Sequence, residues 1–132
     1  MDYYIEMLKA SQLKATVQRL TILEIMSHSG HITIDSLYQQ INKTHPTLSL
    51  ATIYKNILIM VEKGVVIEVP VAGAKSYYEL KKQDHIHIIC KECGMIEDRD
   101  MDKEACSWDD KYSNFSLSHI EINLYGVCSN CQ

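Results

Sequence analysis

Two cysteine pairs are the residues of this sequence best suited to chemistry. Cys90 and Cys93 are separated by two residues, as are Cys128 and Cys131. This spacing lets one tight turn offer two thiolates to an ion, and four thiolates satisfy tetrahedral Zn²⁺ in a closed structural site. Structural disulfides are not expected, because a reducing cytosol keeps thiols free. The pairs therefore predict a structural zinc site.

Two other chemistries are known for Cys-X-X-Cys pairs. Redox activity needs a thioredoxin-like strand–helix–strand setting, which neither pair has in the expected elements. An iron–sulfur cluster normally uses a more closely spaced run of cysteines. Zinc is therefore favoured, and the fifth cysteine, Cys106, is expected to be a buried or incidental thiol.

A second site is predicted just before the first cysteine pair. His85 and His87 alternate along an expected strand over residues 85–90. Side chains of a strand alternate between its faces, so both imidazoles leave one face, while Ile86 and Ile88 turn to the opposite face, expected to be the core side. The alternation therefore lets two imidazoles converge on one point.

The remaining ligands of this second site must come from elsewhere in the chain. Candidates are Glu79, Asp98 and one of the N-terminal histidines. Three imidazoles with two carboxylates suit Fe²⁺, Mn²⁺ or Zn²⁺ better than Ca²⁺, which prefers oxygen ligands alone. Alternatively, His85 and His87 are ordinary surface residues of a strand, a structure that their spacing fits equally well.

The segment before these sites has the pattern of a winged helix-turn-helix. Apolar residues recur at helical spacing in four stretches, three of which follow a Thr or Ser that can act as an N-cap. Two β-type runs then form a hairpin across a glycine. The expected elements are helices over 3–11 and after Thr16, Thr33 and Ser49, followed by strands over 65–69 and 76–80.

The fourth helix would lie in the DNA major groove, with the hairpin as the wing. Its exposed side carries hydroxyl, amide and amine groups, which bind phosphates or base edges; its Asn56 is suited to read adenine. The alternative is an ordinary polar helix face. The predicted DNA-contacting residues are Lys14, Arg19, Ser49, Thr52, Tyr54, Lys55 and Asn56.

Charge is divided unevenly along the chain. Residues 1–82 carry nine Lys and Arg against seven Asp and Glu, a net charge of +2, whereas residues 83–132 carry four against ten, a net charge of −6. Only the first part is suited to approach a polyanion. The N-terminus lacks a signal-peptide pattern, and no apolar run is long enough for a membrane span, so a cytoplasmic protein is expected.

These patterns predict two domains, 1–80 and 85–132, joined by a polar hinge at 81–84. The second domain is expected to be a small α/β unit. Besides the strand with the histidines, its expected elements are a strand over 95–98, a helix over 103–112 and a strand over 117–125 with Ile120, Ile122 and Leu124 pointing inward.

Five segments together resemble the ferric uptake regulator superfamily of bacterial metal-dependent repressors, and most of all its peroxide-stress branch. The resemblance implies an α+β fold, with an N-terminal winged helix-turn-helix and a C-terminal α/β dimerisation domain. It also implies a homodimer that binds a palindromic double-stranded DNA operator. The segments are 13–20, 49–56, 64–66, 84–94 and 125–131.

The resemblance also implies a role for each candidate ligand. Cys90, Cys93, Cys128 and Cys131 would hold the structural zinc, and His31, Glu79, His85, His87 and Asp98 would hold a regulatory Fe²⁺ or Mn²⁺. An ion bound across the hinge favours one arrangement of the two domains by its differential affinity. The metal would then act as a corepressor, because its occupancy sets the affinity for DNA.

Within the superfamily, Asp98 points to peroxide sensing, because iron sensors tend to have Glu at this position. In peroxide sensors the oxidised histidines match His31 and His85, and their oxidation releases DNA. Three residues depart from the usual pattern. Glu79 stands where peroxide sensors commonly have Asp, Val17 replaces a proline, and Ile86 stands where iron and zinc sensors often have a carboxylate for an additional metal site. An iron-sensing repressor without peroxide sensing is the alternative.

Two other classes of protein could use the same metal ligands. An enzyme would use His31, His85 and His87 as a catalytic metal centre with Glu79 or Asp98 as the base. A zinc adaptor would bind structural zinc without a second metal. Neither class explains the pattern of the expected recognition helix, so we expect a regulator and no enzymatic activity. The sequence suggests no role for His119.

Overall fold

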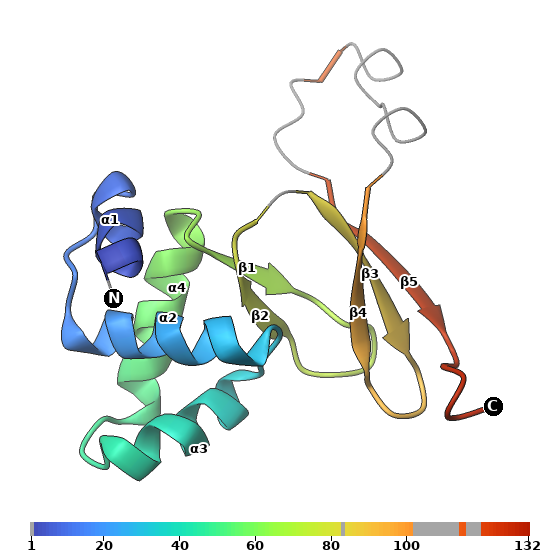
Figure 1. Ribbon diagram of the computed structural model, residues 1–132, viewed down its shortest axis with the longest axis horizontal. Helices are drawn as coiled ribbons and strands as arrows, with labels where there is room; N and C mark the ends of the chain where they lie inside the picture. Colours follow the sequence, from blue (N-terminus) through green and yellow to red (C-terminus); the bar gives the residue numbers. More distant parts are fainter. Residues whose placement is uncertain (1, 83, 102–113, 116–119) are drawn as a thin grey trace. The chain divides into compact units, whose positions relative to one another are not determined.

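The computed structural model describes residues 2–82, 84–101, 114–115 and 120–132. Its contacts divide the chain into two compact units, an N-terminal unit over 1–81 and a C-terminal unit over 82–132. The N-terminal unit contains α1 (Asp2–Ala10), α2 (Val17–Ser29), α3 (Ile34–Thr44), α4 (Leu50–Glu62), β1 (Val66–Val69) and β2 (Tyr77–Leu80) (Figure 1). The C-terminal unit contains β3 (His85–Cys90), β4 (Ile96–Asp100) and β5 (Ile122–Gly126).

Three of the helices begin at the predicted N-caps. The hydroxyl oxygens of Thr16, Thr33 and Ser49 each accept a hydrogen bond from the backbone N–H three residues on, at 3.2, 3.2 and 3.1 Å. These bonds satisfy N–H groups that have no partner within the helix. The capping residues therefore fix where α2, α3 and α4 start.

The helices and the hairpin enclose an apolar core. Each helix contributes the side of its surface on which apolar residues recur every three or four positions. Val65 and Val66 close the core from the start of the hairpin. Its fully enclosed members on the helices are Leu8, Ile22, Leu23, Met26, Leu37, Ile41, Ile53, Ile57 and Met60.

The wing gains a short third segment from the chain that follows α2. β1 and β2 pair as antiparallel strands, with Ile67 opposite Glu79. Ile32 then forms an isolated bridge to Tyr78, with both backbone N–H···O bonds made, at 3.0 and 2.8 Å. Gly30 ends α2 with a positive φ, of 74°, which glycine adopts without strain. This turn sends the chain toward β2.

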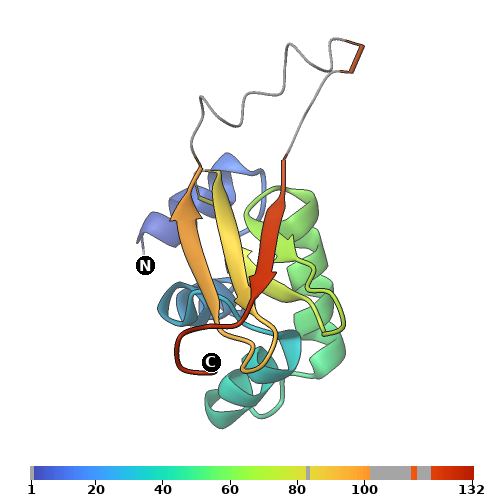
Figure 2. The ribbon, with the colours of Figure 1, turned by 90° about the vertical axis from the view of Figure 1, so that its right-hand side faces the viewer.

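The C-terminal unit is built on a three-stranded mixed sheet in the order β4-β3-β5. Figure 2 shows β3, in yellow, between β4 in orange and β5 in red. β4 is antiparallel to β3, with Asp98 opposite His87, and β5 is parallel to β3, with Gly126 opposite Cys90. These two registers determine which side chains can meet.

Two predictions about the faces of this sheet were wrong. Ile86 and Ile88 were expected in the core, but both are only half-buried, while His87 on the opposite face is buried. Leu124 was expected to point inward and is 50% exposed. Alternation assigns residues to two faces, but the face that becomes covered depends on tertiary packing. The expected helix over 103–112, Cys106 and His119 lie outside the described residues.

Within the part of the chain that the structure describes, no helix has the length and apolar character needed to cross a membrane.

Candidate functional site

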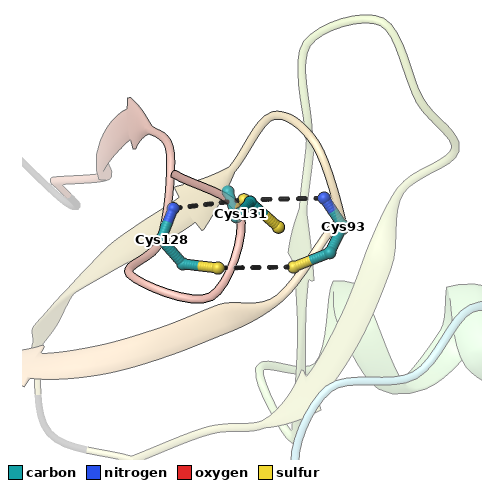
Figure 3. A group of neighbouring side chains, drawn as sticks. Cys93, Cys128 and Cys131 are labelled. Atoms are coloured by element: carbon teal, nitrogen blue, oxygen red, sulfur yellow. Dashed lines mark hydrogen bonds between the residues drawn. The ribbon is translucent and has the colours of Figure 1, made fainter.

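The four paired cysteines converge in the C-terminal unit. Cys90 ends β3 and Cys93 lies in the turn that follows, while Cys128 and Cys131 lie after β5. Because β3 and β5 run parallel, both chain segments leave the sheet at the same end. Figure 3 shows Cys93 and Cys128 reaching toward each other from these two segments. The four Sγ atoms lie within 4.8 Å of one another.

Backbone N–H groups organise the sulfur atoms of this cysteine cluster. Sγ of Cys90 accepts hydrogen bonds from N–H of Cys128, at 3.4 Å, and of Cys93, at 3.5 Å. These donors lower the pKa of the Cys90 thiol to about 6, with Cys128 as the larger cause. The neighbouring Cys128 thiol, together with burial, raises the pKa of Cys131 to about 12. Four adjacent thiolates therefore need a cation between them.

The dimensions of the cluster fit Zn²⁺. Tetrahedral coordination with Zn–S bonds of ~2.3 Å places neighbouring sulfur atoms about 3.8 Å apart. Sγ of Cys93 and Sγ of Cys128, which come from different segments, are 3.8 Å apart. Gly94, with φ of 78°, reverses the chain directly after Cys93. The cluster is therefore suited to a closed, structural zinc site.

His31 and Glu79 lie side by side in the N-terminal unit. Nε2 of His31 is 2.8 Å from Oε2 of Glu79. The backbone bridge between Ile32 and Tyr78 brings them together, because His31 directly precedes Ile32 and Glu79 directly follows Tyr78. Glu79 is 1% exposed, although a buried carboxylate is costly unless it is paired. An imidazole and a carboxylate at this separation are spaced like two neighbouring ligands of one transition-metal ion, which stand about 3 Å apart.

A second group forms on β3 and β4 in the C-terminal unit. Nε2 of His85 and Nε2 of His87 are 2.9 Å apart, with the rings edge to face. Oδ1 of Asp98 lies 3.7 Å from the first and 3.6 Å from the second. Two imidazole nitrogens and a carboxylate oxygen thus point at one another, as ligands of a metal ion do. Alternation of side chains along β3 puts both histidines on one face, and the pairing of β3 with β4 puts Asp98 opposite His87.

Lys82 also takes part in this second group, although no sequence pattern marks it as a site residue. Its Nζ contacts Oδ2 of Asp98, while Oδ1 of the same carboxylate lies near the two histidines. Asp98 is thus held on one side by an ammonium group and offers its other oxygen to the imidazoles. The contact depends on how the hinge leads into β3, which local sequence patterns do not specify.

The predicted DNA-contacting residues of α4 lie at its start. Ser49 caps the helix, and its Oγ also lies 2.9 Å from Oγ1 of Thr52. Tyr54 and Lys55 are exposed. Leu50, which is not among the predicted contacts, is 43% exposed and lies one turn before Tyr54. Spacing by four residues on a helix places these two on one side, and the pair could have been found from that spacing.

Arg19 joins the start of α2 to α4. Its Nε donates to Oδ1 of Asn56, at 3.1 Å, and its Nη1 donates to the backbone carbonyl of Lys14, at 2.9 Å. Asn56 in turn donates through Nδ2 to the carbonyl of Thr52, at 3.0 Å. Lys14 itself is exposed. All seven predicted DNA-contacting residues thus come from two neighbouring segments of the N-terminal unit.

Comparison with known proteins agrees with the fold and these groups. The model of the ferric uptake regulator family matches residues 10–125. The chain therefore belongs to this family of metal-dependent, DNA-binding transcriptional repressors, and the enzyme alternative is excluded. The predicted family and the α+β fold class are both confirmed.

Similar proteins include peroxide regulators. The peroxide operon regulator of Bacillus subtilis is 34% identical over 96% of this chain and 90% of its own length. The peroxide-responsive repressor of Staphylococcus saprophyticus is 33% identical over 95% of this chain and 86% of its own length. The crystal structure of the Campylobacter jejuni peroxide stress regulator matches with a TM-score of 0.78 and a sequence identity of 37%. The match covers 96% of this chain and 98% of that chain.

Proposed function

We propose that this protein is a peroxide-responsive repressor that binds its operator when a regulatory site holds Fe²⁺ or Mn²⁺. The observation that carries the proposal is the pair of ligand groups, one in each unit: His31 with Glu79, and His85 and His87 with Asp98. The similarity to peroxide regulators over nearly the whole chain supports the same function.

The proposed mechanism of metal control depends on one ion being bound by both ligand groups at once. Five residues separate Glu79 from His85, a tether that spans at most about 20 Å. Such a short connection gives the groups a high effective concentration for each other. The ligands of the two groups would hold one ion together, and that ion would favour the arrangement of the units in which all five ligands reach it. Metal occupancy would then set DNA affinity, because the arrangement would fix the spacing of the recognition helices.

The peroxide response is assigned to His31 and His85. His31 and His85 would help to hold Fe²⁺, which when bound would lend an electron to peroxide and regain it as the imidazole is oxidised, chemistry that Mn²⁺ would not supply. In the net reaction one oxygen of H₂O₂ is inserted into the imidazole C–H bond, the other leaves as water, and the histidine loses two electrons. An oxidised imidazole is a poorer ligand, so the five-ligand set is broken and the metal no longer favours the DNA-binding arrangement.

We further propose a homodimer that binds a palindromic operator in the cytoplasm. Two helices related by a twofold axis read half-sites about 34 Å apart on one face of DNA. Exposed apolar side chains in the C-terminal unit support association through that unit. They are Met95, Leu124 and Val127. The cysteine cluster fastens the chain after β5 to β3, and structural zinc would hold this surface in place.

The test is operator binding by protein loaded with Fe²⁺ or Mn²⁺, before and after exposure to peroxide. The operator is first selected from a random duplex library with the Mn²⁺-loaded protein. Mass spectrometry then locates oxygen addition. We expect the Fe²⁺ form alone to lose DNA and to gain one oxygen at His31 or His85, while His28, exposed on α2, stays unmodified.

Other outcomes separate the candidate functions. If the Fe²⁺ form keeps its DNA and its histidines intact after peroxide, the protein is an iron-sensing repressor. If neither metal changes DNA affinity, the regulatory site does not control binding. If oxygen adds equally to His28 and the site histidines, the oxidation does not report a metal-centred reaction.

A further inference from the structure

We infer that Asn56 positions Arg19 for a DNA phosphate and does not itself read a base. The inference rests on the proposed function, because it concerns how the same surface binds the operator. It changes the role predicted for Asn56 from sequence, where an exposed amide on the recognition helix is suited to read adenine.

The first argument is that the Asn56 amide is already engaged at both ends. Its Oδ1 accepts from Nε of Arg19, at 3.1 Å, and its Nδ2 donates to the carbonyl of Thr52, at 3.0 Å. An arginine can only donate and a carbonyl can only accept, so a single orientation of the amide satisfies both partners. Reading adenine needs that same acceptor and donor together. Each end of the amide keeps a second lone pair or N–H, but the two bonds hold its plane against Arg19 and the backbone of α4, so Asn56 is fixed for Arg19 and is not free to turn toward a base edge.

The second argument is that Arg19 is clamped in place. Besides its bond to Asn56, its Nη1 donates to the carbonyl of Lys14, at 2.9 Å. The guanidinium is thus held by two elements, the connector before α2 and the recognition helix α4. Among the described residues no hydrogen bond or ion pair uses Nη2. A planar guanidinium with a fixed edge and remaining donors is suited to bind a phosphate.

The third argument concerns the setting of the pair. Arg19 and Asn56 are both half-buried, whereas their neighbours Lys14, Tyr54 and Lys55 are exposed. An arginine without such a clamp loses side-chain entropy when it binds. Asn56 therefore holds Arg19 in position before DNA binds. Because Asn56 lies on α4, the position of Arg19 also depends on the orientation of that helix.

The test is a double-mutant cycle on the full chain loaded with Mn²⁺, using Arg19→Ala, Asn56→Ala and both together. Affinity is measured for the selected operator, for a set of duplexes with single base changes, and over a range of KCl concentrations. Asn42→Ala, an exposed asparagine on α3, is the matched control. Circular dichroism checks that each variant is folded.

We expect each single variant to weaken binding about tenfold on every duplex. The slope of the logarithm of affinity against the logarithm of KCl concentration should also become shallower by about one. The double variant should lose no more than either single one, because both remove the same contact. Asn42→Ala should bind like the wild type. If Asn56→Ala unfolds, Asn56→Ser, whose side chain is too short to reach Arg19, takes its place.

Two results would overturn the inference. One is a loss of preference at a single base pair in Asn56→Ala with an unchanged salt slope, which indicates base reading. The other is additive losses in the double variant, which indicates independent contacts. Failure of the proposed function looks different, since the wild-type protein would then bind no duplex in a metal-dependent way.

Discussion

Nε2 of His31 lies 2.8 Å from Oε2 of Glu79, inside the N-terminal unit and with Glu79 almost completely buried. His31 follows the end of α2 and Glu79 lies on β2 of the wing, so the pair connects two elements of the DNA-binding fold. A buried carboxylate with a nearby imidazole is prepared to accept a divalent cation, because the cation satisfies both groups. The proposed regulatory site would thus be anchored in the unit that carries α4.

Glu79→Gln keeps the size of the side chain and removes its charge. We expect the affinity for Mn²⁺ to fall at least about tenfold, because one charged ligand is lost. Zinc content should stay that of the wild type, since the cysteine cluster uses no residue of the N-terminal unit. Titration against a competing chelator measures the Mn²⁺ affinity, with Glu24→Gln, exposed on α2, as the control. Wild-type Mn²⁺ affinity in Glu79→Gln would remove Glu79 from the site.

Cys128→Ser separates the structural metal from the regulatory one. We expect the protein to lose its zinc, because three thiolates and a hydroxyl bind Zn²⁺ far more weakly than four thiolates. The C-terminal unit should then unfold at lower temperature, since the chain after β5 is no longer fastened to β3. Elemental analysis and thermal denaturation measure both effects. Cys106→Ser is the control, and equal zinc loss in this variant would argue against the four-cysteine site.

The N-terminal unit could be predicted well because its signals are local. Thr16, Thr33 and Ser49 each cap a helix through a hydrogen bond to the N–H three residues away. Such a bond depends only on the residues around it, so its sequence pattern is sufficient. The packing of the helices then follows from their apolar spacing, and the hairpin follows from two β-type runs joined across a glycine.

The assembly of the sites depends on non-local pairing. The spacing of Cys90 and Cys93 predicted a pair, but only the parallel pairing of β3 with β5 brings the second pair beside it. The single bridge between Ile32 and Tyr78 has no sequence signature, although it sets His31 against Glu79. The exposure of Leu124 was missed for the same reason, because alternation does not say which face is covered.

Ser49 and Thr33 form a matched pair for testing the recognition helix. Both cap a helix with the same hydrogen bond, but only Ser49 begins α4. We expect Ser49→Ala and Thr33→Ala each to lower the free energy of unfolding by about 1 kcal/mol. Ser49→Ala alone should also weaken operator binding, because its hydroxyl lies among the proposed DNA contacts. Chemical denaturation and fluorescence anisotropy measure the two effects. Equal DNA affinity in both variants would limit Ser49 to capping.

Lys82 is expected to compete with the regulatory metal. Its ammonium group contacts Oδ2 of Asp98, whose Oδ1 faces His85 and His87, so a cation binding at Oδ1 shares the carboxylate with a positive charge. Because the Lys82 side chain is 49% exposed and water screens its charge, removing that charge changes the interaction by only ~1 kcal/mol, or about fivefold in affinity. Lys82→Met should therefore bind Mn²⁺ about fivefold more tightly in a chelator competition.

Lys81→Met is the matched control for Lys82→Met. The neighbouring lysine carries the same charge and is also exposed, but it belongs to the N-terminal unit and makes no described ion pair. Its replacement should leave Mn²⁺ affinity close to that of the wild type. If both variants tighten binding equally, the effect comes from net charge. If Lys82→Met weakens binding, the ammonium group instead holds Asp98 in the orientation that the metal requires.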